Sequence, residues 1–191
     1  MKLTELFHLE QREEPISPEE PIQPSEALSE AFAILSRNDL TVAETLADCI
    51  ADTKKYFAAH GEVLERRGLQ YSEEACPWLR VIAAVQSAMD KGYLCELYAD
   101  CSMEDFICAV KFLLDRAGIV FSTDQIRFDP QKNLAAWVRQ FNGYAGQSGI
   151  TLLFIDLYSD SRTMGVAYIA DYVEAVEMAG YAGVKITCRP D

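Results

Sequence analysis

Four carboxylates are the residues of this sequence whose type and spacing best suit chemistry. They are Glu96, Asp100, Asp156 and Asp160. The first two belong to the end of a short apolar run, and the other two bracket a turn later in the chain. Carboxylate oxygens are the ligands that magnesium and calcium take in proteins. If the ends of the strands meet, the four side chains would hold a divalent metal ion for an enzyme reaction.

The turn that carries Asp156 and Asp160 also has a purely structural interpretation. Alternation along the preceding strand puts Leu153, Ile155 and Leu157 on one face, and Leu152 and Phe154 on the other. Asp156 interrupts the second apolar row and therefore needs a partner, which Arg162 can supply across a tight hairpin. Ser159, Asp160 and Ser161 are residue types that favour turns. We therefore prefer a hairpin turn to a metal site here.

The sequence lacks the residue patterns of nucleophilic catalysis and of phosphate-binding loops. The two histidines, His8 and His60, lie in the N-terminal segment and just before a glycine, and no G-x-S-x-G nucleophile motif occurs. Glycines recur at 143, 146 and 149, but they follow a predicted helix and precede a strand, which reverses the order of a phosphate-binding loop. The sequence predicts no catalytic residue and no cofactor.

Charge and cysteine content narrow the range of partners and compartments. The formal net charge of -13 opposes binding to nucleic acid, because phosphate backbones would be repelled. None of the six cysteines forms a CxxC pair, so we expect reduced thiols and no zinc site. The sequence has no apolar run of about 20 residues that would span a membrane, and its start does not resemble a signal peptide. We expect a soluble, cytoplasmic protein that binds no membrane.

The N-terminal part of the chain is predicted to be a tether followed by helices. Residues 1–24 form a short segment and a Pro-rich acidic linker, and residues 25–191 form a single domain with a helical part, 25–92, and a sheet-containing part, 93–191. Ser25 is expected to cap the first helix, and Thr41 with Glu44 a longer second helix that Gly61 ends. A third helix follows Ser72.

From Tyr93 the pattern changes to strands separated by helices. We predict strands at 93–98, 119–121, 151–158, 163–169 and 184–188, and helices that follow Ser102, begin at Asp129, and cover 171–179. Apart from the inserted second helix and the short second strand, this is the element order of a ferredoxin-like split βαβ unit. The predicted class is α+β, with the N-terminal helices packed on a small antiparallel sheet. We expect helices on one face of the sheet and the first strand at its centre.

Two stretches resemble a known protein family. They are WLRVIAAVQSAMDKGYLCELYAD, a helix with a Gly-Tyr-Leu exit into an acidic strand, and the later DLYSDS. The chain is similar over about residues 78–166 to an uncharacterised bacterial family, domain of unknown function six-six-three-zero. The resemblance implies no activity, cofactor or partner.

Three functions remain open at this point. The first is a non-catalytic protein-binding or regulatory module that recognises another protein, or a second copy of itself, through an acidic and aromatic surface. The second is the metal-dependent enzyme described above. The third is a small-molecule-binding domain whose sheet is lined by tyrosines.

Overall fold

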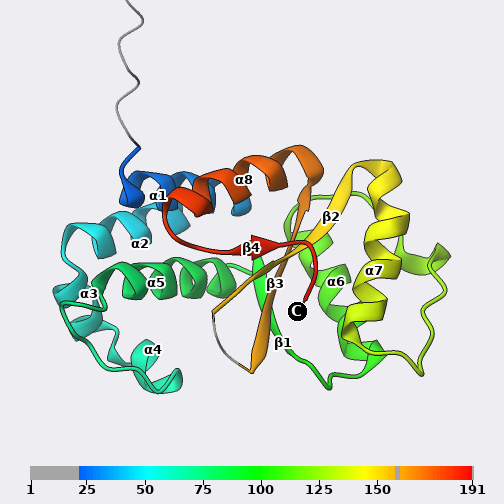
Figure 1. Ribbon diagram of the computed structural model, residues 1–191, viewed down its shortest axis with the longest axis horizontal. Helices are drawn as coiled ribbons and strands as arrows, with labels where there is room; N and C mark the ends of the chain where they lie inside the picture. Colours follow the sequence, from blue (N-terminus) through cyan, green and yellow to red (C-terminus); the bar gives the residue numbers. More distant parts are fainter. Residues whose placement is uncertain (1–21, 158–159, 191) are drawn as a thin grey trace, which may run out of the picture.

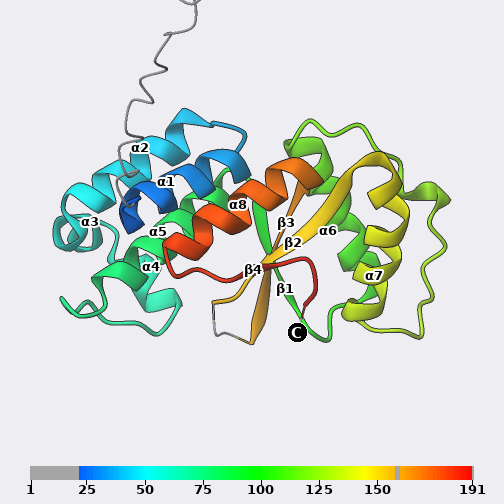
Figure 2. The same cartoon turned by 45° about the horizontal axis from the view of Figure 1, so that its top comes forward.

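Strand β2 (Ile150–Ile155) lies in the middle of the fold and is buried on both faces. Its sequence, ITLLFI, contains no charged residue, as a strand covered on both sides requires. In the computed structural model, which describes residues 22–157 and 160–190, β2 belongs to a four-stranded antiparallel sheet of order β1-β3-β2-β4. Helices lie on both sides of this sheet (Figures 1 and 2).

The helices and strands alternate in blocks along the chain. The N-terminal helices are α1 (Pro24–Leu35), α2 (Leu40–Ala51), α3 (Thr53–Ala59), α4 (Gly61–Arg66) and α5 (Cys76–Asp90). They are followed by β1 (Leu94–Tyr98), α6 (Met103–Arg116), α7 (Leu134–Ala145), β2, β3 (Ser161–Tyr168), α8 (Ile169–Tyr181) and β4 (Ile186–Thr187). Short 3-10 turns occupy Thr123–Gln125 and Gly146–Ser148. Within the described residues, the helices are too short or too polar to cross a bilayer.

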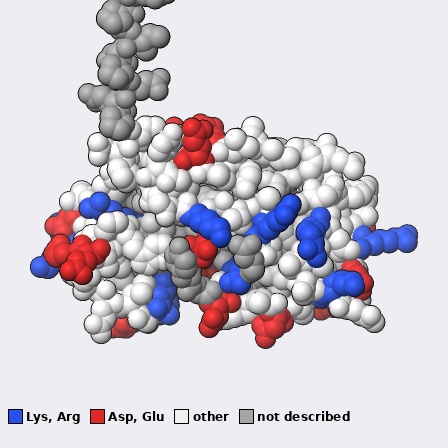
Figure 3. Space-filling view, viewed as in Figure 1, with Lys and Arg blue, Asp and Glu red and all other residues white. Residues whose placement is uncertain are grey.

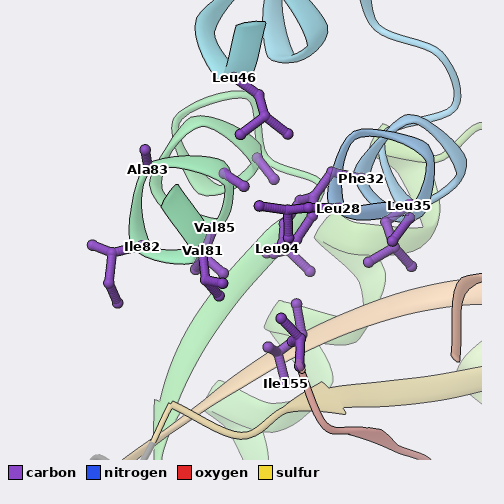
Figure 4. Packing of buried hydrophobic residues seen from close by; sticks show 14 of the residues in the cluster. Leu28, Phe32, Leu35, Leu46, Val81, Ile82, Ala83, Val85, Leu94 and Ile155 are labelled. Atoms are coloured by element: carbon purple, nitrogen blue, oxygen red, sulfur yellow. The ribbon is translucent and has the colours of Figure 1, made fainter. Parts of the chain in front are cut away.

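Each face of the sheet carries its own hydrophobic core. On one face Leu153, Ile155 and Leu157 pack with α1, α2, α5 and α8, and Figure 4 shows this packing around Phe32, Val85 and Leu94. On the other face Leu152 and Phe154 pack with α6 and α7. The predicted alternation is confirmed. The expectation of helices on one face only was wrong, because both rows of β2 are apolar and each needs a cover.

The α+β class is confirmed, and so is the split βαβ arrangement of the first three strands. Strand β3 lies between β1 and β2 and is antiparallel to both. The last strand, β4, pairs with β2 through only two residue pairs, Phe154 with Thr187 and Ile155 with Ile186. Strand β1 is therefore at an edge of the sheet and not at its centre as predicted. The strand predicted at 119–121 is absent, and Val120 there is fully exposed.

Gly165 of β3 leaves space for a leucine from each of the two neighbouring strands, β1 and β2. It pairs with Leu94 on one side and with Leu153 on the other. A Cβ atom at this position would lie 2.8 Å from Leu94 Cδ2 and 3.2 Å from Leu153 Cδ1. Both leucines are buried, so the missing side chain of Gly165 is the space that they fill.

Local capping residues explain where the predicted helix boundaries hold and where they move. The capping box of Ser102 and Asp105 is confirmed at the start of α6. Helix α2 is instead capped by Asp39, whose Oδ1 accepts from the Thr41 N–H at 2.9 Å. The predicted second helix is broken at Asp52, which caps α3 by accepting from the Lys55 N–H. A side chain that can cap a new helix thus ends the preceding helix, although the apolar pattern continues through this point.

Two further boundaries differ from the prediction. Gly61 opens α4 instead of ending a helix, and α7 begins at Leu134 behind the cap Asn133, not at Asp129. Helix α1 has Pro24 in its first turn, and Ser25 is not its cap.

Asp39, which caps α2, also connects this helix to two elements that are distant in the sequence. Asp39 Oδ2 accepts hydrogen bonds from the Tyr93 hydroxyl at 3.1 Å and from Arg116 Nη2 at 3.1 Å. The Arg116 guanidinium lies over the Tyr93 ring, 4.5 Å from its centroid. The start of α2, the entry to β1 and the end of α6 are held by this one network.

Candidate functional site

Three of the four candidate carboxylates stand at the same end of the sheet. Asp156 directly follows β2, and Asp160 directly precedes β3. Because Tyr98 pairs with Ser161, the end of β1 is level with the start of β3, and Asp100 follows it there. The backbone therefore brings the ends of these strands to one end of the sheet.

Glu96 is further inside the sheet and already has a cationic neighbour. Its Oε1 lies 2.9 Å from Nη2 of Arg67, which follows α4. The two side chains are only 29% and 14% exposed. Directly opposite on β3, the hydroxyl of Thr163 is buried without a hydrogen-bond partner. Glu96 therefore helps to fix Arg67 against the edge of the sheet.

The described residues do not gather into a metal-binding group. Among 22–157 and 160–190, no three His, Cys, Asp or Glu side chains lie where one ion could bind them. Glu96 faces Arg67, and Asp156 faces Lys185. The metal site at Glu96, Asp100, Asp156 and Asp160 stays a prediction for a solution test.

Asp156 has a partner that the sequence did not indicate. Its Oδ2 lies 3.7 Å from Nζ of Lys185, and its backbone N–H donates to the Lys185 carbonyl at 3.0 Å. Lys185 precedes β4, far from Asp156 in sequence, so no local pattern could have identified it. Of the predicted turn, Ser159 lies outside the described residues.

A small cleft opens beside this ion pair, between the ends of β2 and β3 and the C-terminal segment. Its volume is about 110 Å³. The described residues that line it are Phe154, Ile155, Asp156, Leu157, Ser161, Arg162, Lys185, Thr187, Arg189 and Pro190. It thus contains three basic side chains, two hydroxyls and one carboxylate. Figure 3 shows basic side chains gathered across the middle of this face, around β4.

A second feature, the outer face of α8, was missed by sequence reasoning. The helix buries Ala175 and Ala179 and leaves Ile169, Val173 and Tyr181 40%, 58% and 52% exposed. Much of the surface over α8 in Figure 3 carries no charged side chain, although an acidic patch lies at its upper edge. The exposed residues were hard to identify from the sequence because α8 has apolar residues on both sides: Tyr172, Val176 and Met178 pack on the core with the two alanines.

A groove lies next to this face, between α1 and α8. It has a volume of about 600 Å³, and its lining includes three carboxylates, Glu30, Asp171 and Glu174. Asp171 pairs with Arg37 at 3.4 Å, and the Arg37 guanidinium lies 5.4 Å from the centroid of the Tyr168 ring. An apolar row and an acidic groove are therefore neighbours on one surface.

Three of the described side chains that could act as a nucleophile or a base, His60, Cys49 and Cys95, are engaged or hard to ionise. His60 Nδ1 lies 2.9 Å from the Tyr56 carbonyl, and its ring stacks on Tyr56 with centroids 4.4 Å apart. His8 lies outside the described residues. All six cysteines are free, and burial raises the pKa of Cys49 to about 11 and that of Cys95 to about 12. Buried thiols of this kind are inert packing residues at neutral pH.

Comparison with known proteins gives a family without an assigned activity. No curated protein and no solved structure matches the chain. The model of one family, described as a domain of unknown function, DUF6630, matches residues 27–190. The match begins inside α1 and ends in the segment that follows β4, so it includes every strand of the sheet. This agrees with the resemblance noted in the sequence, and the chain belongs to the DUF6630 family.

Proposed function

We propose that this protein is a non-catalytic protein-binding module, and that it binds its partner through the outer face of α8 and the adjoining α1–α8 groove. The observation that carries the proposal is the exposed apolar row of α8 beside a groove lined by carboxylates. We call these two features together the α8 surface.

The apolar row supplies the hydrophobic part of the contact. Ile169 and Val173 are one helical turn apart, and Tyr181 is exposed two turns after Val173, with the exposed Glu177 between them. Exposed apolar patches bordered by polar residues are typical of protein interaction sites. Tyrosine is among the residues that contribute most to binding energy in such sites.

The charges beside this row indicate the chemistry of the partner. Glu30 and Glu174 are exposed in the groove, and the whole chain carries a formal charge of -13. A complementary partner presents basic side chains next to an apolar patch. Electrostatic attraction of this kind mainly increases the association rate and the specificity, so binding should weaken as salt is added.

Two features of the chain support binding without covalent chemistry. The His60 ring is occupied at a helix end, and burial keeps the thiols of Cys49 and Cys95 protonated. Two of the tyrosines expected to line the sheet, Tyr98 and Tyr168, are exposed and lie at opposite ends of the neighbouring strands β1 and β3.

Site-specific crosslinking tests this proposal. A photo-reactive amino acid is placed at Val173 and, as a control, at Val120, which is fully exposed in the connection between α6 and α7. We expect crosslinking to one protein from the host lysate at position 173 and not at position 120. The captured protein is then purified and its affinity is measured with Val173→Lys and Val120→Lys. We expect about a tenfold or larger loss for the first variant and none for the second.

A second copy of the chain is one of the partners that this experiment would detect. In that case the crosslinked species has twice the mass of the chain, and light scattering should show that Val173→Lys dissociates a dimer. Equal crosslinking at both positions, or equal affinity of both variants, would contradict the proposal.

A further inference from the structure

We infer that the cleft between the ends of β2 and β3 and the C-terminal segment binds a small phosphoryl group, either free phosphate or a phosphate monoester. This is a separate site from the α8 surface, and it does not depend on the proposed function. The inference rests on the charge of the cleft, on the way its wall is anchored and on its size.

The described lining of the cleft has more basic than acidic side chains, whereas the chain as a whole is acidic. The chain has 17 Lys and Arg against 30 Asp and Glu, whereas the described lining contains Arg162, Lys185 and Arg189 against the single carboxylate of Asp156. The Asp156 carboxylate is beside the Lys185 ammonium at 3.7 Å. By formal count, the described lining therefore has more basic than acidic side chains. Arginine is well suited to binding phosphate oxygens because its planar N–H groups donate in pairs.

The wall that carries two of these basic residues is fixed by hydrogen bonds. The Lys185 carbonyl accepts from the Asp156 N–H at 3.0 Å. Further along, the Cys188 carbonyl accepts from Asn142 Nδ2 at 3.0 Å. Asn142 itself is held by β2, since its Oδ1 accepts from the Leu152 N–H at 2.8 Å. The segment that contains Lys185 and Arg189 is therefore attached to β2 and to α7, although β4 has only two residues.

One hydroxyl of the lining fixes the wall of the cleft, because the Thr187 hydroxyl donates to the Arg189 carbonyl. Ser161 at the start of β3 and Thr187 in β4 both line the cleft. Buried or half-buried apolar side chains, Phe154, Ile155 and Leu157, form the rest of the lining and lower the local dielectric. Hydrogen bonds between charged groups are stronger in such surroundings than in open water.

The size of the cleft restricts the ligand. A volume of about 110 Å³ accommodates a phosphate or a similar oxyanion but is far below the 300 to 1,000 Å³ of pockets that enclose drug-sized molecules. A ligand larger than phosphate must therefore place its phosphoryl group in the cleft and leave the rest of its structure outside. Free phosphate and a monoester share this chemistry, and they differ in what lies outside the cleft.

Titration calorimetry on the full chain tests the inference. The probes are inorganic phosphate, phenyl phosphate and acetate, each at fixed ionic strength so that general screening is constant. We expect saturable phosphate binding that weakens about tenfold or more in Arg162→Gln and in Arg189→Gln. Arg66→Gln in α4 removes one exposed positive charge away from the cleft and serves as the matched control. We expect this control to bind phosphate as the unmodified protein does.

The pattern of probes separates the two sources of the phosphoryl group. Tighter binding of phenyl phosphate than of phosphate supports a monoester ligand, and equal binding supports the free ion. Equal weakening in Arg66→Gln and in the cleft variants would overturn the inference, because it would show a general charge effect. Tighter binding of acetate than of phosphate, or no saturable binding of phosphate below about 10 mM, would also overturn it. Circular dichroism of each variant confirms that a lost affinity does not reflect unfolding.

Discussion

The guanidinium of Arg67 lies 2.9 Å from the carboxylate of Glu96, and this ion pair joins the segment after α4 to the edge strand β1. Neither side chain is well exposed, and Nη2 of Arg67 is also 3.7 Å from the sulfur of Met89. The pair therefore attaches the segment that follows α4 to the edge of the sheet.

A double-mutant cycle should show that this pair is stronger than an ion pair at the surface. Arg67→Ala or Glu96→Ala leaves the other group half-buried without its partner, and we expect each change to lower the free energy of unfolding by about 1 to 3 kcal/mol. The pair of Lys111 and Asp124, with side chains 55% and 79% exposed, is the control. Its coupling energy should be below about 0.5 kcal/mol. Urea denaturation provides the four free energies of each cycle, and equal couplings for the two pairs would contradict the prediction.

Gly165 and Gly143 should respond to alanine in opposite directions. Gly165→Ala places a Cβ atom against Leu94 and Leu153, and we expect a loss of about 1 to 3 kcal/mol. Gly143 is an exposed position inside α7 with no atom within 4 Å of an added Cβ. Gly143→Ala should stabilise the protein by about 0.5 to 1 kcal/mol through helix propensity. Thermal melts compare the two variants, and a neutral Gly165→Ala would show that the leucines can move apart.

The network around Asp39 should make stability depend on pH in the acid range. Burial disfavours the charged form of Asp39, but hydrogen bonds from the Thr41 backbone and the Tyr93 hydroxyl outweigh burial and lower its pKa below the ordinary value of 3.8. A carboxyl with a lower pKa in the folded state stabilises the protein above its unfolded pKa. That stability is lost as the pH falls through the folded pKa. We expect Asp39→Asn, which can still cap α2, to unfold with a shallower pH dependence between about pH 5 and pH 2. Parallel profiles for the two proteins would exclude this role.

The cysteines should differ strongly in their reaction with iodoacetamide. Cys108 is exposed on α6, whereas Cys49 is buried and has a pKa raised to about 11 by that burial. Cys95, with a pKa raised to about 12, is mostly buried in β1. Because the thiolate is the reactive form, Cys108 should be alkylated first and the other two last. Mass spectrometry of timed digests gives the order, and early labelling of Cys49 in the folded protein would contradict it.

A metal titration tests the carboxylate hypothesis independently of the fold. Glu96 and Asp156 each face a basic side chain that a metal ion would have to displace. We therefore expect no change in melting temperature with magnesium, manganese or calcium. A bound ion at a hundred times its dissociation constant would instead stabilise the protein by about 2.7 kcal/mol. A shift of that size that disappears in Asp156→Asn would establish the metal site.

Local patterns in the sequence predicted which segments form strands and helices better than they predicted where the helices end. The alternation in β2 and the capping box of Ser102 and Asp105 were readable because all the participating residues are close in sequence. The long helix through Asp52 was predicted as continuous because its apolar spacing hardly changes where the chain turns. A competing cap decided the boundary, and a short-range pattern does not reveal which of two caps is stronger.

Long-range pairing could not be predicted from these patterns. The position of β4 beside β2, and with it the contact of Lys185 with Asp156, depends on how two elements that are far apart in the chain pack. The same holds for the cleft and for the exposed row of α8. The sequence showed Asp156 as an acid that needs a partner, but it did not show that Lys185, which directly precedes β4, would lie beside it.

Among the strands that the structure describes, β1 pairs with β3 alone, and the long stretch of sequence between these two strands has a consequence for synthesis on the ribosome. Strand β1 emerges before α6 and α7, yet it pairs with β3, which is made after both of them. Until β2 and β3 have left the exit tunnel, β1 has no strand to pair with, and the N–H and C=O groups of its backbone stay unpaired. Ribosome-bound chains that stop before β3 should therefore be sensitive to protease, and chains that extend past β4 should become resistant.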